Sequence, residues 1–130
     1  MASLEESIVT ILTGNVALAA LVGTRVEPAP KAQGSALPAI SYTRVSTVAV
    51  HAHSGAVGLR RAWVQFDVWA SSALSAQAVT QALHTALEHY RGTVGGVRID
   101  AALSLNDRAV YNPEANSYRR IVEYYIWSNS

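Results

Sequence analysis

The stretch GLRRAWVQFDVWA, residues 58–70, decides the fold because its side chains alternate with the period of a β-strand. Between residues 60 and 69, one face of the predicted strand carries Ala62, Val64, Phe66 and Val68. The other face carries Arg61, Trp63, Gln65, Asp67 and Trp69. Because two tryptophans are too much apolar surface to leave in water, we expect both faces of this strand to be covered.

The same kind of pattern predicts further strands at 38–47, 97–105 and 118–127, and a short one at 24–27. The expected core face is made by Val64, Phe66, Val68, Val122, Tyr124 and Ile126. The opposite face would hold Trp63, Trp69, Ile121, Tyr125 and Trp127. In the strand at 97–105, alternation predicts that Val97, Ile99, Ala101, Leu103 and Leu105 point inward.

Three helices are predicted from capping residues and helical spacing. Ser3 and Glu6 form a capping box before Leu4, Ile8, Ile11 and Leu12, and Gly14 is a plausible end. Asn15 can cap a second short helix at 16–22, which Gly23 would end. A long helix at 72–90 would bury Val79, Leu83, Ala86, Leu87 and Tyr90 and expose Gln77, Gln81, His84 and Glu88.

These elements predict one domain of residues 1–130 in the α+β class. Short connections between strands favour antiparallel pairing. We therefore expect an antiparallel sheet of about four to five strands with helices packed on one face. The predicted order is α-α-β-β-β-α-β-β.

The composition limits the classes of function. The chain has 130 residues, no cysteine and a net charge of +1, which excludes disulfides and thiolate metal sites and gives no electrostatic reason for nucleic-acid binding. Charged residues make up 15%, against about 25% in ordinary domains. Either Ser, Thr, Ala and Asn cover the surface, or other subunits do. The apolar run 16–22 is too short to span a bilayer, and the N-terminus lacks the basic start of a secretory signal.

Histidines make a metal site the first chemical hypothesis. His51 and His53 on a strand would project from one face about 7 Å apart, but a third ligand is needed. The nearest candidates are His84, Glu88 and His89 on the long helix. Because residues 51–58 carry two glycines and a serine, we interpret them as a hairpin connection or a flexible loop that includes His51, His53, Ser54 and Gly55. We expect no bound metal or cofactor.

No catalytic motif emerges from the remaining polar residues. There is no G-x-S-x-G, and the glycines at 92–96 lack phosphate-binding spacing. The aspartates that could form paired carboxylates fit the polar positions of an alternating strand, or a turn: Asp67, Asp100 and Asp107. We therefore expect no enzymatic activity.

Two arginine pairs admit two interpretations. Arg60-Arg61 and Arg119-Arg120 lie within predicted strands. They would be either strand-edge charges that discourage pairing or charge partners across a subunit contact.

Four segments together resemble a known family. They are LEESIVTILTGNVALAALVGTRV at 4–26, LPAISYTRVS at 37–46, GLRRAWVQFDVWA at 58–70 and NDRAVYNPEANSYRRIVEYYIW at 106–127. Their order and spacing resemble the tail completion, or tail terminator, proteins of long-tailed bacteriophages, which have relatives in gene transfer agents. The resemblance covers nearly the whole chain.

The resemblance implies a structural virion protein at the head-proximal end of the tail, assembled in the bacterial host cytoplasm. It implies a hexameric ring that ends the tail tube and joins the tail to the head. The partners would be further copies of the chain, the tail tube protein and the head connector or stopper protein. DNA would pass through the lumen without specific binding, and no membrane would be involved.

A ring needs two different contact patches on each subunit. Trp63, Trp69, Ile121, Tyr125, Trp127 and Arg61 are the residues that we expect in one of them. The loop 28–37 or the first helix would supply the other. The alternative is a small metal-binding or ligand-binding α+β module, the latter with a pocket between helix and sheet, although Val79, Leu83, Leu87, Val64 and Phe66 are large enough to fill that space.

Overall fold

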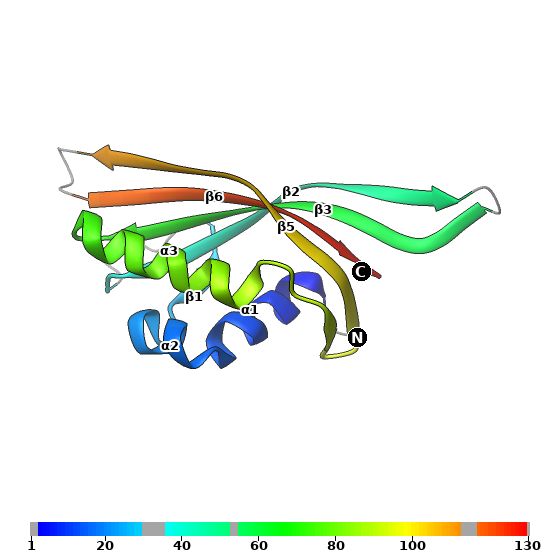
Figure 1. The fold of residues 1–130 in the computed structure, drawn as a ribbon, viewed down its shortest axis with the longest axis horizontal. Helices are drawn as coiled ribbons and strands as arrows, with labels where there is room; N and C mark the ends of the chain where they lie inside the picture. The colour runs from blue at the N-terminus through cyan, green and yellow to red at the C-terminus, as the bar shows by residue number, and fades with distance from the viewer. Residues whose placement is uncertain (1–2, 30–35, 53–54, 113–116, 130) are drawn as a thin grey trace.

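The computed structural model describes residues 3–29, 36–52, 55–112 and 117–129. Its elements in chain order are α1 (Leu4–Gly14), α2 (Val16–Val22), β1 (Val26–Pro28), β2 (Ala39–Ala52), β3 (Gly55–Ala70), α3 (Ala73–Leu87), β4 (Gly92–Val94), β5 (Val97–Asn112) and β6 (Ser117–Ser128). The strands form one sheet in the order β1-β2-β3-β6-β5-β4. All three helices lie on the same side of this sheet (Figure 1).

The α+β class and the one-sided helical layer are confirmed, but the sheet is larger than predicted and is mixed. Its strands number six rather than four to five, and β1 runs parallel to β2. The strand missing from the prediction is β4, which pairs with the start of β5. Gly95 and Gly96, with φ of 58° and 84°, make the tight turn between β4 and β5. A two-residue hairpin turn needs such positive φ values, so these glycines allow β4 and β5 to form a hairpin.

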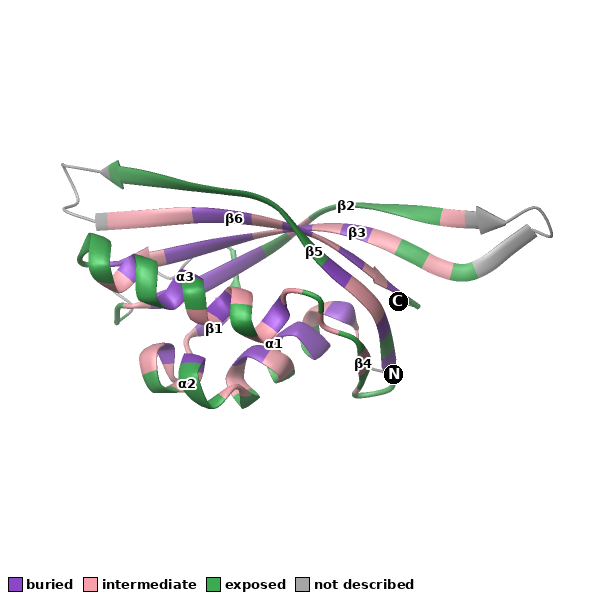
Figure 2. Cartoon of the chain, viewed as in Figure 1, coloured by how far each residue is buried: buried purple, intermediate pink, exposed green. Residues whose placement is uncertain are grey.

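The predicted core is confirmed. All six residues of the expected core face are at most 1% exposed: Val64, Phe66, Val68, Val122, Tyr124 and Ile126. Val79, Leu83 and Leu87 of α3 pack against them in the same cluster. Figure 2 shows buried residues along the sheet above the helices. Phe66 and Tyr124 meet edge to face, with ring centroids 5.9 Å apart, an arrangement that aromatic pairs favour.

The helix caps are confirmed by hydrogen bonds. The Ser3 hydroxyl accepts from the backbone N–H of Glu6 at 3.2 Å, and the Asn15 side chain accepts from that of Leu18 at 3.0 Å. Ser72 caps α3, which ends at Leu87, three residues before the predicted end. Among the described helices none is by itself long and apolar enough to cross a membrane; α1 and α2 together reach that length but meet at 90°.

The inward pattern predicted for residues 97–105 is wrong in its second half. Val97 and Ile99 are buried, but a bulge between Ile99 and Ala101 shifts the alternation by one residue. Ala102 therefore points inward, whereas Leu103 and Leu105 are 40% and 45% exposed. A bulge inserts one unpaired residue and so reverses the faces that follow it.

Two pairs of strands continue beyond the sheet body as ribbons, and this was not predicted. The β2–β3 ribbon and the β5–β6 ribbon extend in opposite directions (Figure 1). The former includes part of the predicted flexible loop: His51 pairs with Ala56, and Ala52 with Gly55. Of the two interpretations, the hairpin connection agrees with this pairing, and His51 and Gly55 belong to its strands rather than to a flexible loop. His53 and Ser54 lie outside the described residues.

Candidate interaction surface

The six residues predicted for a subunit contact come together on the sheet face that points away from the helices. Within the β3–β6 ladder, Arg61 lies opposite Trp127, Trp63 opposite Tyr125, and Asp67 opposite Ile121. Residues directly opposite each other share a face. We call this surface the outer aromatic face, made by Arg61, Trp63, Trp69, Ile121, Tyr125 and Trp127.

Hydrogen bonds within the chain fix the two tryptophans of β3. The indole N–H of Trp63 donates to a Glu123 carboxylate oxygen at 2.9 Å. That of Trp69 donates to the Ser41 hydroxyl at 3.0 Å. Each ring is therefore tied to a neighbouring strand by its indole N–H, which has a hydrogen-bond partner within the chain.

Two arginines pack against the aromatic rings of this face. The Arg61 guanidinium lies 4.4 Å from the ring centre of Tyr125, and that of Arg119 lies 5.0 Å from the ring centre of Trp69. Arg119 also lies 3.4 Å from the carboxylate of Asp67, which is only 7% exposed. These are cation–π and ion-pair distances.

The strand-edge interpretation of the arginine pairs is wrong. Both Arg60-Arg61 and Arg119-Arg120 lie on β3 and β6, the two central strands of the sheet. Whether any of these residues meets another subunit stays a prediction.

The outer aromatic face is neither buried nor fully open. Ile121 is 5% exposed, and the other five residues are half-buried. The rings of Tyr125 and Trp127 meet edge to face, with centroids 5.8 Å apart. Side chains that are ordered in advance lose less entropy on contact, which suits association with another protein.

A polar cluster around His84 lies on the helical side of the sheet. The sequence predicted that His84 faces water, but its ring has partners on two strands. One ring nitrogen of His84 lies 2.5 Å from the Tyr124 hydroxyl, and the other lies 3.2 Å from an Asp107 oxygen. Arg120 donates to the same carboxylate at 2.7 Å. The cluster links α3 to the β5–β6 ribbon. The sequence signal for this cluster was Tyr124 on the predicted core face, because a buried tyrosine hydroxyl needs a hydrogen-bond partner.

Burial and charge shape the acid–base properties of this cluster. Burial, followed by the Glu88 and Asp107 carboxylates, raises the pKa of the Tyr124 hydroxyl. Burial acts to raise the pKa of Glu88 too, but hydrogen bonds from Ser104 and the nearby histidines lower it overall. Tyr124 therefore serves as a neutral hydrogen-bonding group.

The metal hypothesis draws no support from this part of the chain. His84 and Glu88 are one turn apart and 3.9 Å from each other. Within the described residues, no three His, Asp or Glu side chains are grouped as metal ligands. His53 lies outside those residues, as does the side chain of His51.

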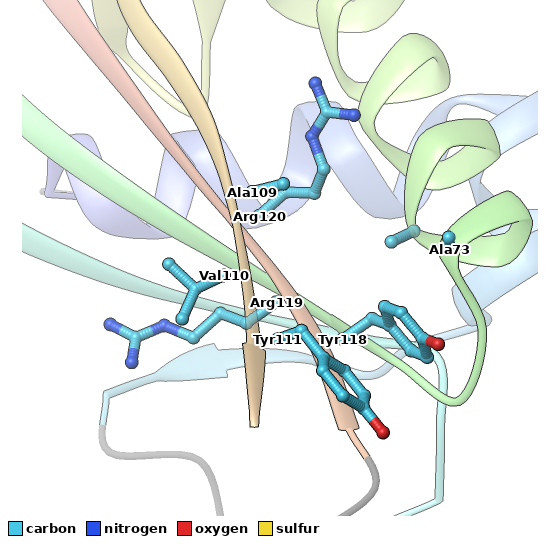
Figure 3. A pocket seen from close by; sticks show the side chains of 8 residues that line it. Ala73, Ala109, Val110, Tyr111, Tyr118, Arg119 and Arg120 are labelled. Carbon is cyan, nitrogen blue, oxygen red and sulfur yellow. The ribbon is translucent and has the colours of Figure 1, made fainter. Parts of the chain in front are cut away.

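Two surface hollows flank α3. One of about 270 Å³ lies between its first turn and the β5–β6 ribbon, beside Ala73, Tyr111 and Tyr118 (Figure 3). The other, of about 320 Å³, lies between α1 and Tyr90. Neither lies between the apolar stripe of α3 and the strand residues Val64 and Phe66, which fill the space that a ligand pocket would need.

Comparison with known proteins identifies the family. The model of the family "Tail completion protein gp17" matches residues 6–129. The chain belongs to this family. It is therefore a structural protein of phage-type tails, as the resemblance of its four segments implied. A search of curated proteins gave no match.

A solved structure shares the fold of this tail completion protein. It is a chain of the "Virion of native gene transfer agent (GTA) particle", with a TM-score of 0.81 and 20% sequence identity. The match covers 97% of this chain and 94% of the other. The likeness in fold therefore extends over nearly the whole length of both chains.

Proposed function

We propose that this tail completion protein forms a hexameric ring at the head-proximal end of the tail, ends the growth of the tail tube and joins the tail to the head. The observation that carries the proposal is the family match over residues 6–129. The chain would bind further copies of itself, the last ring of the tail tube protein, and the head connector or stopper protein. We expect it to reach its place in the virion during assembly in the host cytoplasm.

Surface chemistry supports a role in assembly. Few charges cover the chain, and the outer aromatic face offers a broad, ordered apolar patch at its centre. Aromatic and arginine side chains at the centre of a contact contribute most to binding between proteins. Arg61, Trp63 and Tyr125 combine these chemistries on adjacent strands.

Net charge suits a ring through which DNA passes. A protein that neutralises many phosphates binds DNA tightly. A net charge of +1 gives the chain little overall attraction for phosphates, which is consistent with DNA moving through the lumen. Specific DNA recognition is not part of the proposal.

Omission of the chain tests the function. In a particle-producing strain that lacks it, we expect filled heads without tails, together with free tails of uncontrolled length. Supplying the chain from a plasmid should restore joined particles and uniform tails, as counted by electron microscopy. Normal joining and normal tail length without the chain would contradict the proposal.

A further inference from the structure

We propose that neighbouring copies join by antiparallel strand pairing, in which the edge of β5 at 106–110 binds the edge of β2 at 46–50 of the next copy. The inference rests on the proposed ring and states how that ring closes. It assigns the two different contact patches that a ring needs to two edges of the sheet.

The edge of β2 is unpaired over most of its described length. β1 pairs with β2 only at Ile40–Tyr42, and the last backbone bond on this side runs from Ala29 to Tyr42. In the described residues beyond Tyr42, β2 is paired on its β3 side alone. The backbone groups on the other side are open to a further strand.

The edge of β5 is covered at its start and free later. β4 pairs with Val97–Ile99, after which the His89 N–H donates to the Ala102 carbonyl and the Ser104 N–H donates to Glu88. From Asn106 to Val110, the described backbone is paired only with β6. One edge of the sheet thus opens near one ribbon and the other edge near the opposite ribbon (Figure 1).

Exposed apolar side chains are concentrated on the two strands that carry these edges. Of nine large hydrophobic residues that are exposed in the described chain, six lie on β2 and β5: Val45, Val48, Leu103, Leu105, Val110 and Tyr111. Of these, Val48 and Val110 lie inside the proposed segments. Free edges of monomeric proteins usually carry lysine, proline or inward charges. Residues 46–50, STVAV, contain none of these, whereas 106–110, NDRAV, contain Asp107 and Arg108, so the β2 edge in particular has the character of a strand that is covered in the assembly.

A bulge precedes the proposed segment on both strands. One lies between Arg44 and Ser46, and another between Ser104 and Asn106. A bulge disturbs regular pairing, so the segments 46–50 and 106–110 lie in the regular parts of β2 and β5 that follow the bulges.

Strand direction fits a second copy as the occupant. β2, β3, β6 and β5 are antiparallel in succession, so β2 and β5 run in opposite directions. Rotation about a ring axis keeps the direction of each strand along that axis. A copy placed beside β5 therefore presents its β2 in the antiparallel direction, and repeated head-to-tail contacts of this kind can close into a ring.

The pairing requires neighbouring copies to be shifted along the strand direction, and the size of this shift fits a closed ring. Through the ladder, Arg108 lies level with Ile121, Asp67 and Ser41. To meet Val48 instead, the next copy must shift by about six ladder positions, or about 20 Å. Four strands span about 19 Å across, so the strands would tilt by about 45°, at the upper end of the range in which sheets close into cylinders.

Cysteine cross-linking tests the pairing, because the chain has no cysteine of its own. Arg108→Cys would be combined with Thr47→Cys, Val48→Cys or Ala49→Cys, so that the neighbouring registers are sampled. Opposed Cβ atoms in a ladder lie about 4.5–5.5 Å apart, close enough for a disulfide after a small adjustment. Tails assembled with each double variant would be oxidised, then analysed by denaturing electrophoresis with and without reductant.

We expect at least one double variant to give a series of covalent multimers that reductant abolishes. A mixture of the single variants should give dimers only. The matched control, Val48→Cys with Gln81→Cys on the exposed side of α3, should stay monomeric.

Two results would overturn strand pairing while leaving the ring intact. One is cross-linking no stronger than in the control although the chain is present in the tails. The other is efficient dimerisation of Arg108→Cys alone, which would show that the β5 edge pairs with itself. If the chain is missing from tails assembled by wild type, the proposed function fails, and this inference fails with it.

Discussion

At the scale of residues, Phe66 and Trp63 show how one strand serves two surfaces. Both belong to β3, but Phe66 is fully buried against the helices, whereas Trp63 lies half-buried on the outer aromatic face. The strand therefore has one face that holds the domain together and one that is available to a partner. Substitutions on these two faces should have different consequences.

Phe66→Ala should destabilise the fold itself. Truncating a buried phenylalanine removes its contacts with Tyr124 and leaves a cavity, which costs about 3–5 kcal/mol. Chemical denaturation should show a lower midpoint with an unchanged slope. A loss below about 1 kcal/mol would mean that the core can collapse around the deletion.

Trp63→Ala should leave the secondary structure near normal but reduce incorporation into tails. An aromatic anchor at the centre of a contact often contributes about 2 kcal/mol or more to binding. Trp63→Phe keeps a ring but loses the hydrogen bond to Glu123, and should be less affected. If Trp63→Ala lowers the melting temperature as much as Phe66→Ala and assembles normally, its role lies within the domain alone.

Glu88→Gln should weaken the dependence of stability on acid. Its pKa is lower in the folded chain than the unfolded value of about 4.3, so its stabilising contribution is complete above that value and is lost as pH falls through the folded pKa. The wild type should therefore lose more thermal stability between neutral pH and pH ~3 than the variant. Parallel losses in both chains would contradict this role of Glu88.

At the scale of elements, the short helix α2 depends on its cap. Asn15 provides the side-chain acceptor at its start, and a helix this short has little stability of its own. Asn15→Ala should cost about 0.5–2 kcal/mol, whereas Asn15→Asp keeps the acceptor and should cost little. Thermal melts of both variants would distinguish loss of the cap from a general effect of substitution.

Elements with a buried face could be predicted from the sequence, and ribbons could not. Because one face of β3 and β6 is buried, their side chains alternate between apolar and other types. The same alternation allowed the residues of the outer aromatic face to be predicted from the sequence. Residues 106–110 have no such pattern, because all five are exposed and neither face of this segment is buried in the core.

Local patterns also missed features that depend on geometry. The shift of Leu103 to the outside follows from a bulge, and the bonding of His84 to Tyr124 follows from how α3 lies over the sheet. Neither is determined by neighbouring residues.

At the scale of the whole molecule, the fold combines a compact body with free edges at opposite sides of one sheet. The helices cover one face of the body, and the edges and the outer aromatic face remain accessible to other chains. Such an arrangement is expected of a subunit whose structure is completed by assembly. Contact with other subunits stays our explanation for the low charge of the chain.

Electron cryomicroscopy of the head-proximal end of isolated tails tests the proposed position and stoichiometry of the chain. We predict a single hexameric ring of this chain on the last ring of the tail tube, absent from tails made without it and restored when it is supplied. Tails that carry the chain along the tube or at the distal end, or normal tail ends that lack it, would contradict the proposed function.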